Sequence, residues 1–259
     1  LLWGWMLTAY GSVAVIFNRT QNRKLMPWVC VAMLANIAFF LWLVNFETLP
    51  FERVPHANRL SDGNGLNPLL QHPVMMIHPV LLYTGFTGFA LPFSFAFAAM
   101  VTGELGTTWF RTTRRWTLVA WSVLSAGIML GGRWADEVLG WGGYWAWDPV
   151  ENASLMPWIA GTAYIHSVMI QEKRDMLKTW NLVLIGMTYG LCLFGTFLTR
   201  SGIVQSVHAF TNAGWFPPVF LSYTLVMAIG FFIALAYRSR SLRSTNRLES
   251  VVSREASFV

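Results

Sequence analysis

Apolar runs recur along the chain at a length that is typical of membrane-spanning helices. They cover residues 1–17, 28–46, 78–101, 116–130, 153–170, 180–198 and 216–237. A helix needs about 20 mostly apolar residues to cross a bilayer. Hydrophobic residues make up 55% of the 259 residues and charged residues only 12%. We therefore predict an all-α fold, a polytopic transmembrane helical bundle of about seven spans.

The basic residues alternate with these runs. Fourteen of the 18 lysines and arginines follow the first, third, fifth and seventh runs, at positions 19, 23, 24, 111, 114, 115, 173, 174, 178, 238, 240, 243, 247 and 254. The other four, Arg53, Arg59, Arg133 and Arg200, follow the second, fourth and sixth runs. Loops rich in lysine and arginine stay in the cytoplasm, so the net charge of +6 reflects topology. We expect contacts with membrane lipid and no binding of nucleic acid.

This orientation divides the chain. We expect two spans within residues 1–46, an extracytoplasmic loop at 47–77, a core membrane domain at 78–237 and a basic cytoplasmic tail at 238–259. The outer side then holds residues 47–77, 131–152 and 199–215. Four of the five histidines lie in or beside these segments, namely His56, His72, His78 and His208. Function should therefore lie on the outer face.

Residues 133–158, within the core membrane domain, carry an unusual density of aromatic side chains. They are Trp134, Trp141, Tyr144, Trp145, Trp147 and Trp158, interleaved with Gly142 and Gly143. Tryptophan and tyrosine are enriched at membrane interfaces, and such a belt would account for two or three of them. The remainder favours a flat extracytoplasmic surface for a large planar ligand, with haem as the obvious candidate. We predict a haem platform of Trp134, Trp141, Tyr144, Trp145, Trp147 and Asp148.

Asp148-Pro149-Val150-Glu151 has the order of a helix start. Aspartate is a good N-cap, proline suits the first helical position, and glutamate three residues on completes a capping box. This interpretation competes with a direct role of either carboxylate in ligand handling. The pair Gly131-Gly132 marks a turn or a close approach.

Haem iron is most often held by histidine. His78 and His208 lie near the outer boundary, one on each side of the aromatic segment, and we predict both as axial ligands of haem iron. Taken alone, each fits an interfacial histidine better than a ligand, and only their pairing around the aromatic platform favours the ligand role. His56 and His72 lie further out in the polar loop, where we expect no ligand role. Arg133 and Arg200 are candidates for pairing with haem propionates.

His166 lies inside an apolar run, where ionisable residues are rare and functional by default. Either it ligates a membrane haem with a histidine outside this sequence, or it is a buried, hydrogen-bonded histidine. The two cysteines, Cys30 and Cys192, lie in apolar runs, so no disulfide is expected. The absence of a C-x-x-C-H motif also means that the chain carries no thioether site of its own.

Trp141-Gly-Gly-Tyr-Trp-Ala-Trp-Asp-Pro-Val-Glu-Asn-Ala-Ser154 resembles the tryptophan-rich "WWD" signature of the haem-handling proteins of cytochrome c-type biogenesis. The Asp-Pro-Val-Glu-Asn ending resembles the CcmF/NrfE branch, the haem lyase component. The resemblance extends through residues 66–71, His78-Pro79, 193–202 and 206–210. Because members of this branch are much longer and the chain begins at Leu1, we expect it to be an N-terminal or central part of such a protein.

The resemblance implies that two outer histidines, matching His78 and His208, hold a transient haem b that is the substrate. It implies that His166 ligates a second, permanent membrane haem b only together with a histidine beyond residue 259. The function implied is covalent thioether attachment of haem to the C-x-x-C-H cysteines of apocytochrome c, in a multi-subunit complex in the bacterial inner membrane, with the WWD segment facing the periplasm. The implied partners are a CcmE-type haem chaperone, the apocytochrome and a thiol-reducing CcmH-type subunit.

Three other functions remain open. A CcmC-type protein would deliver haem to a chaperone without ligation. A b-type cytochrome subunit would need at least one complete pair of membrane histidines. A structural assembly subunit would use its aromatic belt only as an anchor.

Overall fold

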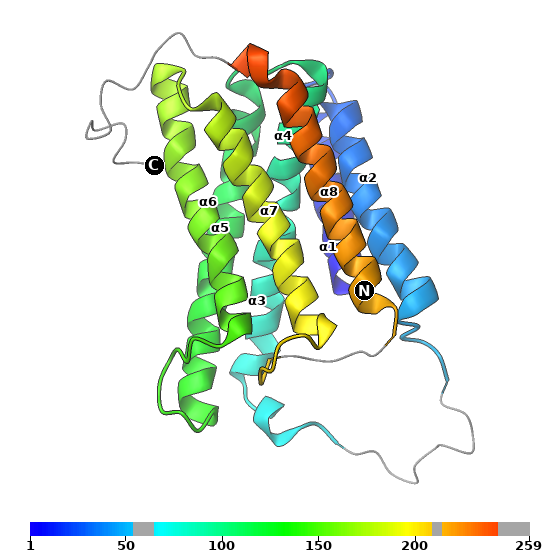
Figure 1. Ribbon diagram of the computed structural model, residues 1–259, viewed down its shortest axis with the longest axis vertical. Coiled ribbons are helices and arrows are strands. Elements are labelled where there is room, and N and C mark those ends of the chain that lie inside the picture. The colour runs from blue at the N-terminus through cyan, green and yellow to red at the C-terminus, as the bar shows by residue number, and fades with distance from the viewer. Residues whose placement is uncertain (54–64, 209–213, 243–259) are drawn as a thin grey trace.

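The computed structural model describes residues 1–53, 65–208 and 214–242, and these form an upright helical bundle (Figure 1). His56, Arg59, Arg243, Arg247 and Arg254, on which expectations were placed above, lie outside the described residues. The α-helices of the described part are α1 (Leu2–Asn18), α2 (Met26–Trp42), α3 (Val74–Gly88), α4 (Ala90–Thr102), α5 (Thr108–Val138), α6 (Pro149–Arg174), α7 (Lys178–Ser201) and α8 (Phe216–Arg238). Short helical turns follow at η1 (Leu43–Glu47), η3 (Pro68–Leu70) and η4 (Ser239–Leu242).

Each of the seven predicted apolar runs is helical, and the all-α prediction is confirmed. Within the described residues, five segments are long and apolar enough to cross a membrane: Met26–Glu47, Val74–Thr102, Thr108–Val138, Lys178–Ser201 and Phe216–Leu242. Helices α3 and α4 form the second of these segments, with a break at Phe89. Helix α1 has only 17 residues, and α6 mixes polar with apolar residues along its length. The count of seven spans therefore stays a prediction.

The helices run up and down, so the connections gather at two ends. Figure 1 shows the α1–α2, α4–α5 and α6–α7 connections at the upper end together with η4, and the α5–α6 connection and the starts of α3 and α8 at the lower end. The upper end carries most of the described basic residues, including Lys24, which pairs with Glu104 at 2.8 Å, and Arg111, which pairs with Glu172 at 3.0 Å. Arg238 donates to the carbonyls of Met100 and Val101 and so caps the last turn of α4. The aromatic segment lies at the opposite, lower end.

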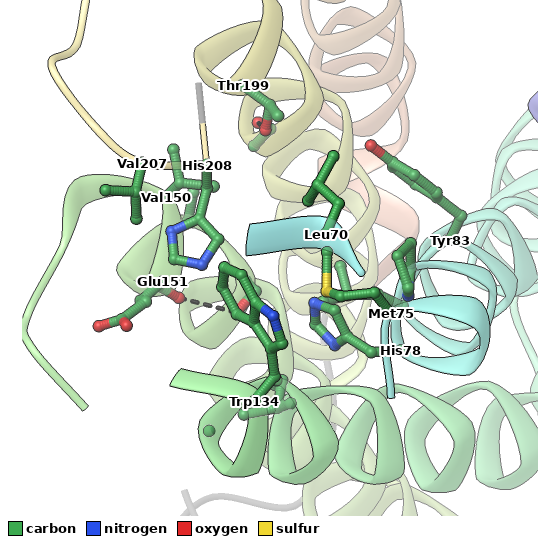
Figure 2. Close-up of a pocket in the computed structure, with 18 of the residues that line it drawn as sticks. Leu70, Met75, His78, Tyr83, Trp134, Val150, Glu151, Thr199, Val207 and His208 are labelled. Carbon is green, nitrogen blue, oxygen red and sulfur yellow. Dashed lines mark hydrogen bonds between the residues drawn. The ribbon is translucent and has the colours of Figure 1, made fainter. Parts of the chain in front are cut away.

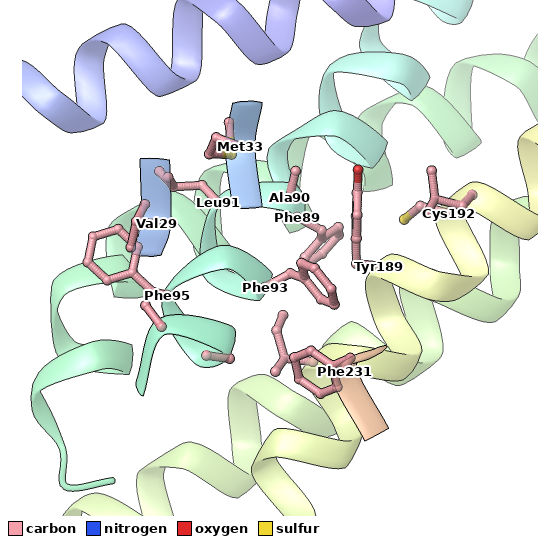
Figure 3. Close-up of a cluster of buried hydrophobic side chains, with 14 of the residues drawn as sticks. Val29, Met33, Phe89, Ala90, Leu91, Phe93, Phe95, Tyr189, Cys192 and Phe231 are labelled. Carbon is pink, nitrogen blue, oxygen red and sulfur yellow. The ribbon is translucent and has the colours of Figure 1, made fainter. Parts of the chain in front are cut away.

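Helix α4 is the centre of the bundle because it is apolar on every side. Figure 3 shows its phenylalanines meeting residues of α2, α7 and α8. Phe93 stacks on Phe231 with ring centroids 4.8 Å apart, and it packs against Tyr189 at 4.9 Å. Tyr189 and Tyr223 both donate to the buried side-chain oxygen of Asn36 on α2. This polar link joins α2, α7 and α8 inside the core.

Helices α3 and α5 approach each other closely, which positions the outer site. A Cβ at Gly85 would lie 2.6 Å from the Leu124 Cβ, and one at Gly127 would lie 2.9 Å from the backbone nitrogen of Leu82. Small residues allow such backbone contact between membrane helices. Because the two helices touch along their length, side chains at the lower end of α3 are held directly against α5.

The aromatic segment differs from the prediction in one respect. We expected the fourth apolar run to end near residue 130 and the outer segment that begins at residue 131 to lie across the surface up to the helix start at Asp148. Instead α5 continues to Val138, and α6 begins at Pro149, so only residues 139–148 are non-helical. The last turns of α5 stay helical because Trp134, Ala135 and Leu139 pack with Val74 in a small apolar cluster. Gly131 and Gly132 consequently lie in a helix and form no turn. Their missing side chains allow His78 and Tyr144 to approach the helix closely.

Candidate functional site

A cavity of about 420 Å³ opens at the lower end of the bundle, between α3, α5, α6 and α7. Its volume is in the range of ligand pockets, roughly 300–1,000 Å³. The walls are mainly apolar and combine residues from distant parts of the sequence: Leu66, Leu70, Met75, Met76, His78, Pro79, Leu82, Tyr83, Phe86, Ile128, Gly131, Gly132, Trp134, Tyr144, Trp145, Val150, Glu151, Ala153, Ser154, Gly195, Thr199, Arg200, Val207 and His208. Both predicted axial histidines line this one cavity.

His78 lies in the second turn of α3. Its Nδ1 is 2.7 Å from the carbonyl oxygen of Gly127 on α5. A carbonyl oxygen only accepts, so Nδ1 carries the proton and Nε2 keeps the lone pair that binds a metal. Gly131 makes room for the ring, because a Cβ there would lie 2.5 Å from the His78 Cε1.

His208 reaches the cavity from the segment that follows α7. Its Nδ1 lies 3.2 Å from the Asp148 Oδ2, at the start of α6. Its backbone nitrogen donates to the Ser206 hydroxyl at 2.9 Å, and this hydroxyl donates to the same Asp148 oxygen at 2.7 Å. Here too the Nδ1 proton is used within the protein, so Nε2 is left as the metal-binding nitrogen. Figure 2 shows His208 and His78 with the Trp134 indole between them in that view.

The predicted cap at the start of α6 is confirmed. The Asp148 carboxylate accepts from the Val150 backbone nitrogen at 3.0 Å, and Glu151 accepts from the backbone nitrogens of Asp148 and Ala146 at 3.2 and 2.9 Å. Asp148 was also placed on the haem platform. It does not line the cavity, because its carboxylate faces Val150, Ser206 and His208.

The other platform residues fall into two groups. Trp134 is only 2% exposed; its indole donates to the Leu69 carbonyl at 3.0 Å and its ring meets His208 edge-on at 5.5 Å. Tyr144 and Trp145 line the cavity, whereas Trp141 and Trp147 do not. Trp147 is 73% exposed. The non-helical segment therefore presents aromatic rings at the mouth, and Trp134 forms part of the wall.

The two candidate arginines differ in position. Arg200 lines the cavity. Arg133 does not; it is exposed and pairs with Glu137 on the same helix at 2.7 Å. His72, for which no ligand role was expected, contacts the other oxygen of Glu137 at 2.8 Å.

His166 is exposed on α6, on the outside of the bundle, and its Nδ1 donates to the Thr162 carbonyl at 2.8 Å. The alternative of a buried histidine is therefore wrong, although the hydrogen bond is present. Within the part of the chain that the structure describes, the three other histidines lie at the lower end of the bundle. The Nδ1 bond leaves Nε2 as the ring nitrogen of His166 that could bind a metal. A second side chain bound to the same metal would have to come from outside the described residues.

Two residues of the site went unnoticed in the sequence. Ser206 is two residues before His208, and a serine that accepts from the backbone nitrogen two residues on is a common local turn. That spacing could have drawn attention to it. The carbonyl of Gly127 gave no such signal, because it acts through the backbone.

Comparison with known proteins shows to which family the chain belongs. Residues 1–205 match the family model described as cytochrome C assembly protein. The chain is 42% identical over 250 residues to the cytochrome c-type biogenesis protein CcmF of Haemophilus influenzae, covering 96% of this chain and 38% of that protein. It is 43% identical over 211 residues to the probable cytochrome c-type biogenesis protein NrfE of Escherichia coli, covering 81% of this chain and 38% of that protein.

A solved structure described as cytochrome c heme lyase CcmF superimposes with a TM-score of 0.76 at 34% identity, over 99% of this chain and 37% of that chain. The chain thus spans less than two fifths of the length of these relatives. The match of the family model to most of the chain and the identity with full-length relatives lead to one assignment. The chain belongs to the cytochrome c assembly protein family, with CcmF and NrfE proteins among its relatives.

Proposed function

We propose that this chain forms the haem-holding part of a cytochrome c haem lyase. Haem b is its substrate and rests in the cavity at the lower end of the bundle, with His78 and His208 as axial ligands. The observation that carries the proposal is the paired arrangement of the two imidazoles. Each donates its Nδ1 proton to a protein oxygen, at Gly127 and Asp148, and each lines the same apolar cavity.

The remainder of the cavity fits a large, flat, mostly apolar ligand with anionic edges. Apolar side chains such as Leu82, Phe86 and Ile128 can cover the porphyrin faces. Arg200 is the candidate partner of a propionate in the wall, because guanidinium groups bind carboxylates strongly. Arg133 does not line the cavity and pairs with Glu137 on the same helix, and we assign it second place because of its position.

The exposed aromatic residues at the mouth supply a surface on which haem can pass between proteins. Tyr144 lines the cavity and is 66% exposed, whereas Trp147 lies outside the lining and is 73% exposed. The Trp147 ring meets that of the lining residue Trp145 edge-on, with centroids 6.5 Å apart. We assign this surface to the arrival of haem from a CcmE-type chaperone and to the docking of the apocytochrome, with a CcmH-type subunit keeping its cysteines reduced. These partners work on the periplasmic side of the bacterial inner membrane, opposite the basic end of the bundle.

The bond-making step belongs to haem and the client protein. Each cysteine thiol of the C-x-x-C-H segment adds across one haem vinyl group. A carbon–sulfur bond forms, the vinyl double bond becomes single, and the thiol proton ends on the other vinyl carbon. The addition itself is redox-neutral, and the family resemblance implies that the iron is ferrous when it takes place. The protein contributes placement. Holding the haem vinyl groups next to the cysteine thiols removes much of the entropic cost of bringing the reactants together.

The outward Nε2 of His166 is the candidate ligand of a second, permanent membrane haem b. The hydrogen bond from Nδ1 to Thr162 fixes the ring orientation that such a ligand needs. Its second axial ligand would have to come from a helix packed on the outer face of α6. When bound, such a haem would supply one-electron chemistry; the described residues contribute one imidazole and an open helix face.

The test is thioether formation in a membrane that contains the maturation partners and an apocytochrome with a C-x-x-C-H segment. We expect the unmodified protein to yield covalently bound haem, detected by haem staining after denaturation, and His78→Ala and His208→Ala to reduce the yield by at least roughly tenfold. Haem bound without any thioether product would contradict the lyase assignment and favour the CcmC-type delivery function. Absence of haem binding would favour a structural subunit.

A further inference from the structure

Asp148 makes contacts that a helix cap alone does not explain. Its Oδ2 accepts from three donors at once: the Val150 backbone nitrogen at 3.0 Å, the Ser206 hydroxyl at 2.7 Å and the His208 Nδ1 at 3.2 Å. Its side chain is only 11% exposed, and that of His208 is 19% exposed. One carboxylate oxygen therefore joins the first turn of α6 to the segment that follows α7.

The two histidines of the cavity differ in what holds their rings. His78 donates to a neutral backbone carbonyl at Gly127, whereas His208 faces a carboxylate. An anionic acceptor on Nδ1 makes the opposite nitrogen a stronger donor to a metal and fixes the tautomer and the ring orientation. The environment thus distinguishes the two imidazoles even though both line one cavity.

We infer that Asp148 is a positioning residue for His208, which it orients toward the iron and makes the stronger of the two axial ligands. The inference rests on the proposed function, because it concerns the haem held in this cavity. Ser206 supports it from the same side. Its hydroxyl accepts from the His208 backbone nitrogen at 2.9 Å while donating to the carboxylate, so ring and backbone are tied to one oxygen.

The arrangement gives the capping aspartate two tasks that can be separated. Asparagine caps a helix as well as aspartate does. Asp148→Asn should therefore keep the start of α6 and remove only the negative charge opposite His208. Asp136→Asn is the matched control, since Asp136 is an exposed carboxylate near the same end of α5.

The experiment is a haem titration of the protein in detergent or nanodiscs, followed by a potentiometric redox titration of the bound haem. We expect Asp148→Asn to weaken haem binding about tenfold or more, as changes to the partner of a ligating histidine usually do. We also expect the reduction potential of the bound haem to rise in this variant, because His208 then becomes a weaker donor and stabilises ferric iron less. Ser206→Ala should shift both quantities in the same direction by less, and Asp136→Asn should shift neither.

A double-mutant cycle separates positioning from general structure. In a His208→Ala background, Asp148→Asn should have no further effect on affinity or potential. An equal effect in both backgrounds would assign Asp148 to the fold alone and overturn the inference. So would Asp148→Asn with unchanged affinity and potential, provided that His208→Ala still weakens binding. If the unmodified protein binds no haem, or if His208→Ala changes nothing, the proposed function itself fails and the inference falls with it.

Discussion

The imidazole of His78 on α3 lies against Gly131 on α5, so closely that a Cβ at that position would be 2.5 Å from the ring carbon Cε1. The contact is between a backbone and the end of a side chain. A methyl group could therefore be accommodated only if the imidazole moved. Such a movement would break the hydrogen bond to Gly127, which sets the orientation of the ring.

Gly131→Ala should accordingly impair haem binding with little loss of stability. Alanine is favoured over glycine in a helix by about 1 kcal/mol, which offsets part of the steric cost. We expect haem affinity to fall by roughly tenfold, consistent with the loss of one oriented ligand. Gly190→Ala in α7 is the control, because a Cβ there meets nothing within 4 Å. Unchanged Soret titrations for Gly131→Ala would contradict the close fit around His78.

Substitution of a tryptophan in the aromatic segment should affect either stability or function, depending on how deeply its ring is buried. Trp134 is 2% exposed and hydrogen-bonded to Leu69, whereas Trp147 is 73% exposed. Replacing a buried tryptophan by alanine costs about 3–5 kcal/mol, and an exposed substitution usually stays within about 0.5 kcal/mol. Trp134→Ala should therefore lower the melting temperature clearly, while Trp147→Ala should reduce cytochrome maturation at normal stability. Equal melting temperatures for the two variants would count against this division.

Asn36 should be a strong determinant of bundle stability. Its side-chain oxygen accepts from the phenols of Tyr189 and Tyr223, which come from α7 and α8. Asn36→Ala leaves the buried Tyr189 hydroxyl without this acceptor, at a cost of about 1–3 kcal/mol, and removes a second bond from the partly buried Tyr223. Thermal unfolding in detergent would show the loss, with Asn45→Ala as the control, since Asn45 is exposed and bonds only within its own turn. A melting temperature equal to that of the unmodified protein would disprove the role.

His166 can be tested separately from the cavity. Where a second axial ligand is available, His166→Ala should remove the contribution of the membrane haem b to the reduced-minus-oxidised spectrum. Haem titration at the cavity should stay unchanged, because the residue lies on the outer face of α6. His72→Ala, which loses a contact to Glu137, should leave both signals in place. A membrane haem signal that survives His166→Ala would show that another residue is the ligand.

Much of this molecule could be predicted from local patterns. Hydropathy located the helices, and the order Asp-Pro-Val-Glu located the start of α6 together with its capping box. These features depend on neighbouring residues, whose spacing the sequence displays directly. The end of α5 was predicted eight residues too early, because Gly131-Gly132 resembles a turn and the cluster around Val74 that keeps the helix intact comes from a distant segment.

The contacts that make the site were beyond local reasoning. Asp148 and His208 are 60 residues apart, and no spacing rule connects a helix cap to a histidine beyond the following helix. The role of Asp148 changed accordingly, from a member of the platform to the partner of His208. Trp134 likewise changed from an exposed ring to a buried one, because its burial depends on the loop segment around Leu69.

The most direct test of the central claim is the coordination state of haem bound to the purified protein. We expect a six-coordinate, low-spin spectrum with two histidine ligands in the unmodified protein. His78→Ala and His208→Ala should each convert it to a five-coordinate, high-spin form, and free imidazole should restore the low-spin spectrum in both. The same low-spin spectrum in both variants without added imidazole would contradict the account, because the iron would then be held by other residues.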